Sequence, residues 1–267
     1  MTYFGFLTVL VGVPLLVLVA LTIVDRRRKR VLRPELSHRP AWAALAVHVA
    51  AALIYTTPWD NYLVATRVWY YNPALVAGVT LGWVPLEEYI FFVAQTCLTG
   101  LWLLWLARRL PSPGQEAIAQ PALRQAAALV TGLVWIGAVV ALAVRSAPAT
   151  YLALEIVWFL PPVILQLSVG ADVLWRRRRL VSLALFPAIA YLSAADAVAI
   201  DAGTWTINPG KSTGILLGGV LPLEELVFFT LTNALIVFGM VLFLSIDPTS
   251  IRPLVRRRPH RTLPSST

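Results

Sequence analysis

Long apolar segments recur along this chain and are separated by short polar connections. Most of them hold about 20 residues, the length that an α-helix needs to cross the hydrocarbon core of a bilayer. The pattern predicts spans at about residues 3–24, 41–57, 85–107, 122–144, 151–174 and 180–200, and a last span that ends near Leu244. We therefore expect an all-α fold, a polytopic transmembrane bundle of about seven spans.

The connections between the spans are polar or rich in turn-forming residues. Residues 60–72 are predicted to form a polar, aromatic loop, and residues 201–213 a loop rich in Gly, Asn and Pro. The tail, residues 247–267, is basic and rich in Pro and Ser, and we expect it to be disordered.

Composition agrees with a membrane protein. The chain is 58% hydrophobic and only 13% charged, whereas about a quarter of the residues in a soluble domain carry a charge. Its single cysteine, Cys97, lies in an apolar segment, so no disulfide and no cysteine metal cluster is expected.

The net charge of +9 comes from arginine blocks between the spans, such as residues 26–30 and 176–179. Of the 22 Lys and Arg residues, three fall on one side of a seven-span topology, at Arg67, Arg145 and Lys211, and the remaining 19 fall on the other. Cytoplasmic loops are enriched in Lys and Arg, so we expect a multi-pass protein of the cell membrane with its N-terminus outside and its C-terminus cytoplasmic. This placement argues against a nucleic-acid partner.

One motif occurs twice. Pro85-Leu86-Glu87-Glu88 is matched by Pro222-Leu223-Glu224-Glu225, and Phe-Phe follows each copy. Proline suits the first position of a helix, and the glutamates then fall in the first turn, where the helix dipole favours an anion. An ionisable side chain at mid-membrane depth costs about 2.5–3.5 kcal/mol or more, so the four glutamates are predicted to be the working site.

The motif belongs to a longer internal repeat. Residues 60–96 align with residues 196–233 with one inserted residue. The alignment pairs Asp60 with Asp196, Trp69 with Trp205, Asn72 with Asn208, and Phe91-Phe92 with Phe228-Phe229. The partner spans are four apart, and an even separation makes the repeats parallel, with both glutamate pairs on the non-cytoplasmic side. The predicted organisation is a three-helix repeat at 1–109, a connection with a linker helix at 110–146, a second three-helix repeat at 147–246, and the tail.

Carboxyls in apolar surroundings suggest acid–base chemistry. Two adjacent acids repel each other, so one is predicted to hold a proton as a general acid while its ionised neighbour serves as a base. Aromatic faces nearby suit a cationic intermediate. The predicted catalytic residues are Glu87, Glu88, Glu224 and Glu225. The predicted substrate-binding residues are Asp60, Trp69, Asn72, Phe91, Phe92, Glu155, Asp196, Trp205, Asn208, Phe228 and Phe229.

Several alternatives remain at these positions. Asn72 and Asn208 precede prolines and also suit turns. His48 suits either proton transfer or a hydrogen-bonded core imidazole. Four carboxylates are able to hold a hard divalent cation, although we expect no metal and no cofactor. Residues 209–213 resemble the end of a phosphate-binding loop, but Trp205 stands where the first Gly is required.

The two Pro-Leu-Glu-Glu motifs, each preceded by Trp and Asn-Pro and followed by Phe-Phe, resemble those of the small integral-membrane lycopene cyclases. The resemblance covers residues 1–246. In many bacteria of that family the two repeats are separate subunits, and here they are fused. The resemblance implies that the chain closes the open-chain ψ-ends of lycopene, usually to β-rings, in the bilayer and beside other carotenoid-pathway enzymes.

The implied reaction begins when a protonated Glu adds a proton to the terminal double bond. The resulting cation is attacked by the next double bond, and a base then removes a ring proton, without net redox change. We expect one composite pocket lined by both repeats, with two independent sites as the alternative. The rival functions are a proton-coupled transporter and a non-catalytic carotenoid-binding protein. A retinal protein is set aside because Lys29 and Lys211 fall in loops.

Overall fold

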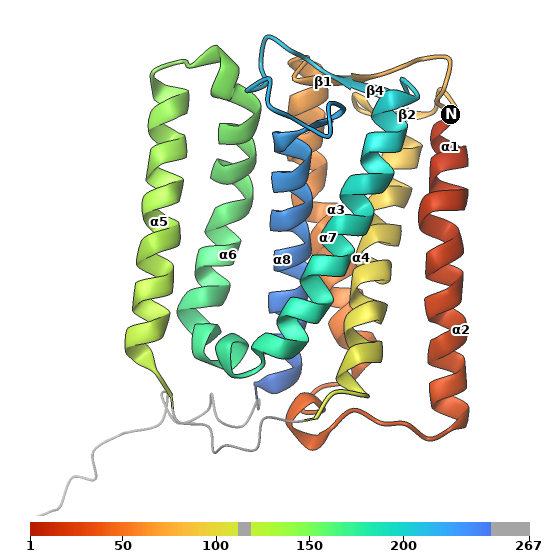
Figure 1. Ribbon diagram of the computed structural model, residues 1–267, viewed down its shortest axis with the longest axis vertical. Helices are drawn as coiled ribbons and strands as arrows, with labels where there is room; N and C mark the ends of the chain where they lie inside the picture. The colour runs from red at the N-terminus through yellow and green to blue at the C-terminus, as the bar shows by residue number, and fades with distance from the viewer. Residues whose placement is uncertain (112–118, 247–267) are drawn as a thin grey trace, which may run out of the picture.

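The computed structural model describes residues 1–111 and 119–246, and in them long helices run side by side as one bundle (Figure 1). Seven helical segments are long and apolar enough to cross a membrane, counting only these described residues. The prediction of an all-α bundle of about seven spans is confirmed. The basic tail, which was predicted to be disordered, lies outside the described residues.

The first span consists of α1 (Tyr3–Phe6), a π-helical turn η1 (Leu7–Gly12) and α2 (Val13–Arg27). The other long helices are α3 (Ala41–Ala65), α4 (Leu86–Ala107), α5 (Pro121–Ala143), α6 (Thr150–Arg176), α7 (Arg178–Asp201) and α8 (Leu223–Ser245). Short 3-10 turns, η2 (Pro34–Leu36) and η3 (Ala147–Ala149), precede α3 and α6.

The loop predicted at residues 60–72 is wrong in its first part, because α3 continues through Pro58 to Ala65. A proline inside a helix costs about 3 kcal/mol. Trp59 and Leu63 are buried in the bundle beyond it, and burying a large apolar side chain gains about 1.5–3 kcal/mol. Packing of the last two turns therefore outweighs the local cost, and Asp60 lies in a helix rather than in a loop.

The described residues form three small two-stranded sheets, and β1, β2 and β4 lie at the end of the bundle that carries the N-terminus (Figure 1). Strand β1 (Trp69–Tyr71) pairs antiparallel with β4 (Trp205–Ile207), which joins the two halves of the chain. Two hairpins, β2 (Thr80–Leu81) with β3 (Val84–Pro85) and β5 (Leu216–Leu217) with β6 (Leu221–Pro222), precede α4 and α8. Two residues connect the first hairpin and three connect the second, which accounts for the inserted residue in the repeat.

Each half of the chain has the same order of two helices, a strand, a hairpin and a third helix. The first span corresponds to α6, α3 to α7, and α4 to α8. Contacts repeat as well: the hydroxyl of Tyr55 donates to the Trp158 carbonyl at 2.7 Å, and the hydroxyl of Tyr191 donates to the Leu10 carbonyl at 2.7 Å. Helix α5 packs along α6 at the edge of the bundle (Figure 1).

The buried core changes character along the bundle. The cluster near the strands is aromatic and includes Trp59, Phe159 and Phe228. The cluster toward the opposite end is aliphatic and includes Leu103 and Met240. The fully buried aromatic rings of the two clusters therefore lie in the half of the bundle beneath the strands.

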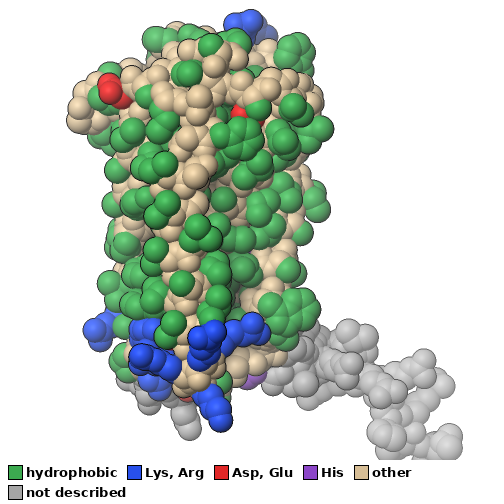
Figure 2. Space-filling view, turned by 90° about the vertical axis from the view of Figure 1, so that its right-hand side faces the viewer, with side chains coloured by type: hydrophobic (Ala, Val, Ile, Leu, Met, Phe, Trp, Pro, Cys, Tyr) green, Lys and Arg blue, Asp and Glu red, His purple; other side chains and the backbone are tan. Residues whose placement is uncertain are grey.

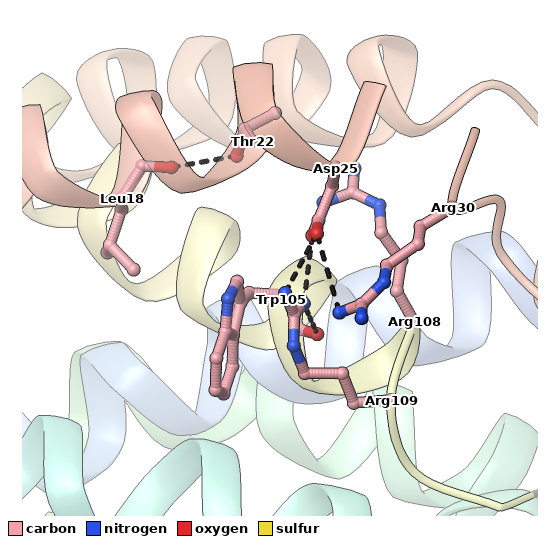
Figure 3. A network of polar contacts seen from close by, with 7 residues as sticks. All are labelled: Leu18, Thr22, Asp25, Arg30, Trp105, Arg108 and Arg109. Carbon is pink, nitrogen blue, oxygen red and sulfur yellow. Dashed lines mark hydrogen bonds and ion pairs between the residues drawn. The ribbon is translucent and has the colours of Figure 1, made fainter. Parts of the chain in front are cut away.

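Lys and Arg side chains gather at the end opposite the strands (Figure 2). There Asp25 of α2 is buried and accepts two hydrogen bonds of 2.8 Å from Arg109, while Arg108 and Arg30 lie 3.7 and 3.8 Å away (Figure 3). A second buried aspartate, Asp172 of α6, lies 2.7 Å from Arg124 of the linker helix α5. Two buried ion pairs thus fix helix ends on this side of the bundle.

Candidate active site

A cavity with an empty volume of about 470 Å³ lies beneath the strands and is lined by both halves of the chain. The residues that line it are acidic or aromatic. They are Tyr3, Phe6, Trp59, Asp60, Trp69, Glu88, Phe91, Phe92, Tyr151, Asp196, Trp205, Glu225, Phe228 and Phe229.

Local sequence places the glutamates at this cavity. Pro85 has an extended backbone (φ −70°, ψ 153°) and ends strand β3, and α4 begins at the next residue. Pro222 does the same before α8. The two Glu pairs then lie in the first turns of their helices, where unpaired backbone N–H groups favour a negative charge.

The first glutamate of each pair holds a loop. Glu87 Oε1 accepts a hydrogen bond of 2.6 Å from the backbone N–H of Ala77. Glu224 Oε1 accepts the equivalent bond of 2.6 Å from Thr213, and the Ser212 hydroxyl donates to its other oxygen at 3.2 Å. Both side chains are fully buried but do not line the cavity.

The second glutamate of each pair lines the cavity and accepts hydrogen bonds from phenols. The hydroxyl groups of Tyr3 and Tyr71 donate to Glu88 Oε2, the second at 3.1 Å. The hydroxyl of Tyr151 donates to Glu225 Oε1 at 2.8 Å. Burial raises the pKa of the Tyr71 phenol well above its usual value, and nearby carboxyls add to the shift. That phenol therefore remains a donor at neutral pH.

Two aspartates face the same cavity from α3 and α7. The Trp205 indole donates to Asp196 Oδ1 at 3.0 Å. Asp196 Oδ2, both carboxyl oxygens of Asp60 and the indole N–H of Trp69 have no hydrogen-bond partner among the described residues. The Trp69 indole nevertheless interacts with the Asp60 carboxyl, as Trp205 does with Asp196. Buried polar atoms without a partner are uncommon, so the remaining carboxyl oxygens are able to accept from a ligand or water.

Glu155 lies on α6, one helical turn after Tyr151. It is fully buried, and neither of its oxygens has a hydrogen-bond partner within the described residues. Because Tyr151 corresponds to Tyr3, the residue that corresponds to Glu155 in the first span is Leu7. Glu155 thus breaks the symmetry of the two halves.

The aromatic rings pack around the carboxyls. The ring of Trp59 stacks on Phe228 with centroids 5.8 Å apart and an interplanar angle of 2°, and Phe159 meets Trp59 edge-on at 4.7 Å. On the other side of the cavity, the ring centroids of Tyr3 and Trp205 lie 4.9 Å apart. Such rings present negative faces that stabilise a cation.

Ten predicted site residues come together at this cavity: Asp60, Trp69, Glu88, Phe91, Phe92, Asp196, Trp205, Glu225, Phe228 and Phe229. The other five lie outside its lining. Glu87 and Glu224 hold loops, and Glu155 is buried on α6. Asn72 and Asn208 form turns, in which each side-chain oxygen accepts from the backbone N–H two residues later.

Sequence reasoning missed the phenols. Tyr3 and Tyr151 occupy matching positions at the start of the first and fifth predicted spans, so an alignment of those spans contains the signal. Tyr71 is a single residue of a three-residue strand, and its counterpart in the repeat is Ile207, so the repeat gives no signal for it. Among the described residues, no group of side chains is arranged to hold a metal ion.

Comparisons with known proteins give one family. The family model described as Lycopene cyclase matches residues 1–106 and 148–244. The chain is 41% identical over 242 residues to a lycopene beta-cyclase of Halobacterium salinarum strain R1, covering 91% of this chain and 95% of that protein. It is 34% identical to a bifunctional lycopene cyclase/phytoene synthase of Podospora anserina, covering 77% of this chain and 36% of that protein. No solved structure matches the chain.

Proposed function

This chain belongs to the lycopene cyclase family, and we propose that it closes the ψ-ends of lycopene to β-type rings in the cavity beneath the strands. One observation carries the assignment of the site. Glu88 and Glu225, from matching positions in the two halves, line a single cavity with phenol donors and stacked aromatic rings. The name of the relative in Halobacterium salinarum supports the β-ring.

In this proposal Glu88 and Glu225 serve as the acid–base pair. One of them protonates the terminal double bond of the ψ-end, and the next double bond attacks the tertiary cation to close a six-membered ring. The other removes a ring proton, so one proton enters, one leaves, and the product is an isomer of the substrate. Proton transfer by positioned side chains contributes about 10²–10⁴-fold in rate, and the aromatic walls stabilise the cation and exclude water.

The remaining acidic groups have supporting roles. Glu87 and Glu224 fix the loops that precede α4 and α8, through the bonds to Ala77 and Thr213. Asp60 and Asp196 place further negative charge or acceptors near the cation. Proton transport is not favoured, because the inner parts of α4 (residues 100–107) and of α8 (residues 234–244) carry no polar side chain and pack in the aliphatic cluster.

We also propose that the N-terminus and the cavity face the outside of the cell and that the C-terminus is cytoplasmic. The gathering of Lys and Arg at the other end of the bundle (Figure 2) supports this orientation in the cell membrane. Substrate and product are lipophilic, so the enzymes that supply lycopene and consume the cyclic product are expected to work in the same bilayer.

Pigment analysis of a lycopene-accumulating host tests the function. The wild-type chain is expected to yield monocyclic and bicyclic carotenoids. Glu88→Gln and Glu225→Gln are each expected to abolish even the first ring closure, because both residues serve one pocket. Immunoblots of the membrane fraction control for protein amount. Accumulation of monocyclic product in either variant contradicts the composite pocket, and unchanged lycopene with folded wild-type protein contradicts the cyclase activity.

A further inference from the structure

A second hollow runs from the cavity toward the middle of the bundle. It is lined by residues of α3, α4, α6 and α8 and shares Phe92 and Phe228 with the cavity. We name it the α3–α6 groove. Its walls are largely apolar and include Ala51, Phe159 and Leu235.

The groove is open to the surroundings of the bundle along α3. Near the cavity the two helices are joined by Tyr55 and Trp158, whose rings stack at 5.1 Å and which exchange hydrogen bonds of 2.7 and 3.2 Å. Farther along, Val47, Ala51 and Ile54 line the groove and are exposed. In a bilayer these positions face lipid chains, so the opening is a lateral one.

The two halves of the repeat differ in the helix contacts beside the groove. Gly239 of α8 corresponds to Trp102 of α4. The Trp102 indole donates to the carbonyl of Leu183 on α7 at 3.0 Å, and Leu183 corresponds to Val47 in the groove. A Cβ atom on Gly239 would lie 2.2 Å from His48 Nε2. The large side chain that bridges α4 and α7 in one half is thus absent between α8 and α3 in the other, where His48 and Gln166 pack against Gly239 instead.

Most polar side chains of the groove bond to other groups of the protein, as Gln95 Nε2 does to the Thr232 hydroxyl at 3.0 Å, although Gln166 Oε1 has no partner among the described residues. His48 Nδ1 lies 2.7 Å from the Ala44 carbonyl, and Gln166 Nε2 donates to the Leu235 carbonyl at 3.0 Å. They leave a mostly hydrocarbon wall, which suits an apolar chain rather than an ion or a sugar.

We propose that the α3–α6 groove holds the polyene of the substrate, which enters between α3 and α6 from the lipid. The inference rests on the proposed function and adds the path and orientation of the substrate. From Asp60 to Val47 is 13 residues of α3, or about 20 Å at 1.5 Å per residue. A linear C40 carotenoid is about as long as the hydrocarbon core, about 30 Å. One ψ-end therefore reaches the carboxyls, while about a third of the molecule extends beyond the groove.

Two neighbouring alanines of α3 provide a matched test. Ala51 lines the groove and Ala50 does not, and both are exposed on the helix surface. Ala51→Trp is expected to lower cyclised product in the lycopene-accumulating host at least tenfold at equal protein in the membrane. Ala50→Trp is expected to stay within about twofold of wild type. Equal activity of the two variants contradicts the binding of the polyene in the groove. A wild-type chain that forms no rings contradicts the cyclase function itself.

Binding without chemistry gives a second readout. The double variant Glu88→Gln/Glu225→Gln is purified in mild detergent from lycopene-accumulating cells, and bound lycopene per protein is measured from its visible absorption. Adding Ala51→Trp is expected to remove most of the bound lycopene, and adding Ala50→Trp is expected to leave it. Equal lycopene in both proteins, or a phospholipid retained in its place in the parent, overturns the proposal.

Discussion

At the scale of single residues, adjacent glutamates in each motif meet different surroundings. Glu87 accepts from a backbone N–H of its own loop, whereas Glu88 accepts from phenols at the cavity wall. Successive residues of a helix point about 100° apart, so a pair of identical side chains divides between two directions. The motif thus combines a residue that fixes a loop with a residue that lines the cavity.

The first prediction separates these two roles by a conservative change. Glu87→Gln keeps an oxygen that accepts from Ala77, so most of the activity is expected to remain. Glu88→Gln removes the exchangeable proton, and the rate is expected to fall about 10²–10⁴-fold. The measurement is the initial rate of lycopene consumption in isolated membranes. Glu224→Gln and Glu225→Gln form the matched pair, and equal losses within either pair would refute the division.

At the scale of elements, two ion-pair clusters fix helix ends far from the chemistry. Asp25 of α2 meets Arg109 at the end of α4, and Asp172 of α6 meets Arg124 at the start of α5 (Figure 3 shows the first). A buried carboxylate that loses its partners is costly, so these contacts hold the helices in register more than they add net stability.

Asp25→Ala leaves the guanidinium groups of Arg108 and Arg109 together without their counter-ion. Breaking such a buried pair costs about 3–5 kcal/mol, and the thermal midpoint in detergent is expected to fall on the order of 10 °C. Asp201→Ala, at an exposed position that ends α7, is the control and is expected to change the midpoint little. An unchanged midpoint for Asp25→Ala would show that the cluster does not stabilise the bundle.

Helices were the elements that the sequence predicted best, because an apolar run of about 20 residues carries one strong signal. The strands β1 and β4 are three residues long, too short for a periodic pattern. The end of α3 was missed because Pro58 is a local signal, while burial of Leu63 depends on partners distant in the chain. The phenols of Tyr3 and Tyr151 were missed for a different reason, since a tyrosine at the end of a span is also the expected interfacial residue.

At the scale of the whole molecule, the distribution of charge predicts its direction in the membrane. Cys97 is the single cysteine of the chain, so a Cys97→Ala background permits labelling at one chosen position. Thr206→Cys on β4 and Ser37→Cys after η2 are both exposed and lie at opposite ends of the bundle. In intact cells a membrane-impermeant maleimide is expected to label the first and spare the second. The reverse labelling would invert the proposed orientation.

The lateral opening of the α3–α6 groove also determines how the two ring closures of one lycopene molecule follow each other. In the proposed arrangement one end lies in the protein at a time, and the far end extends among lipid tails beyond the described residues that line the groove. A singly cyclised carotenoid therefore has to leave the groove, reverse its orientation in the bilayer and compete with lycopene for a second binding event. Such an enzyme is distributive: when lycopene is abundant the singly closed carotenoid builds up first, and the doubly closed one follows as lycopene runs out.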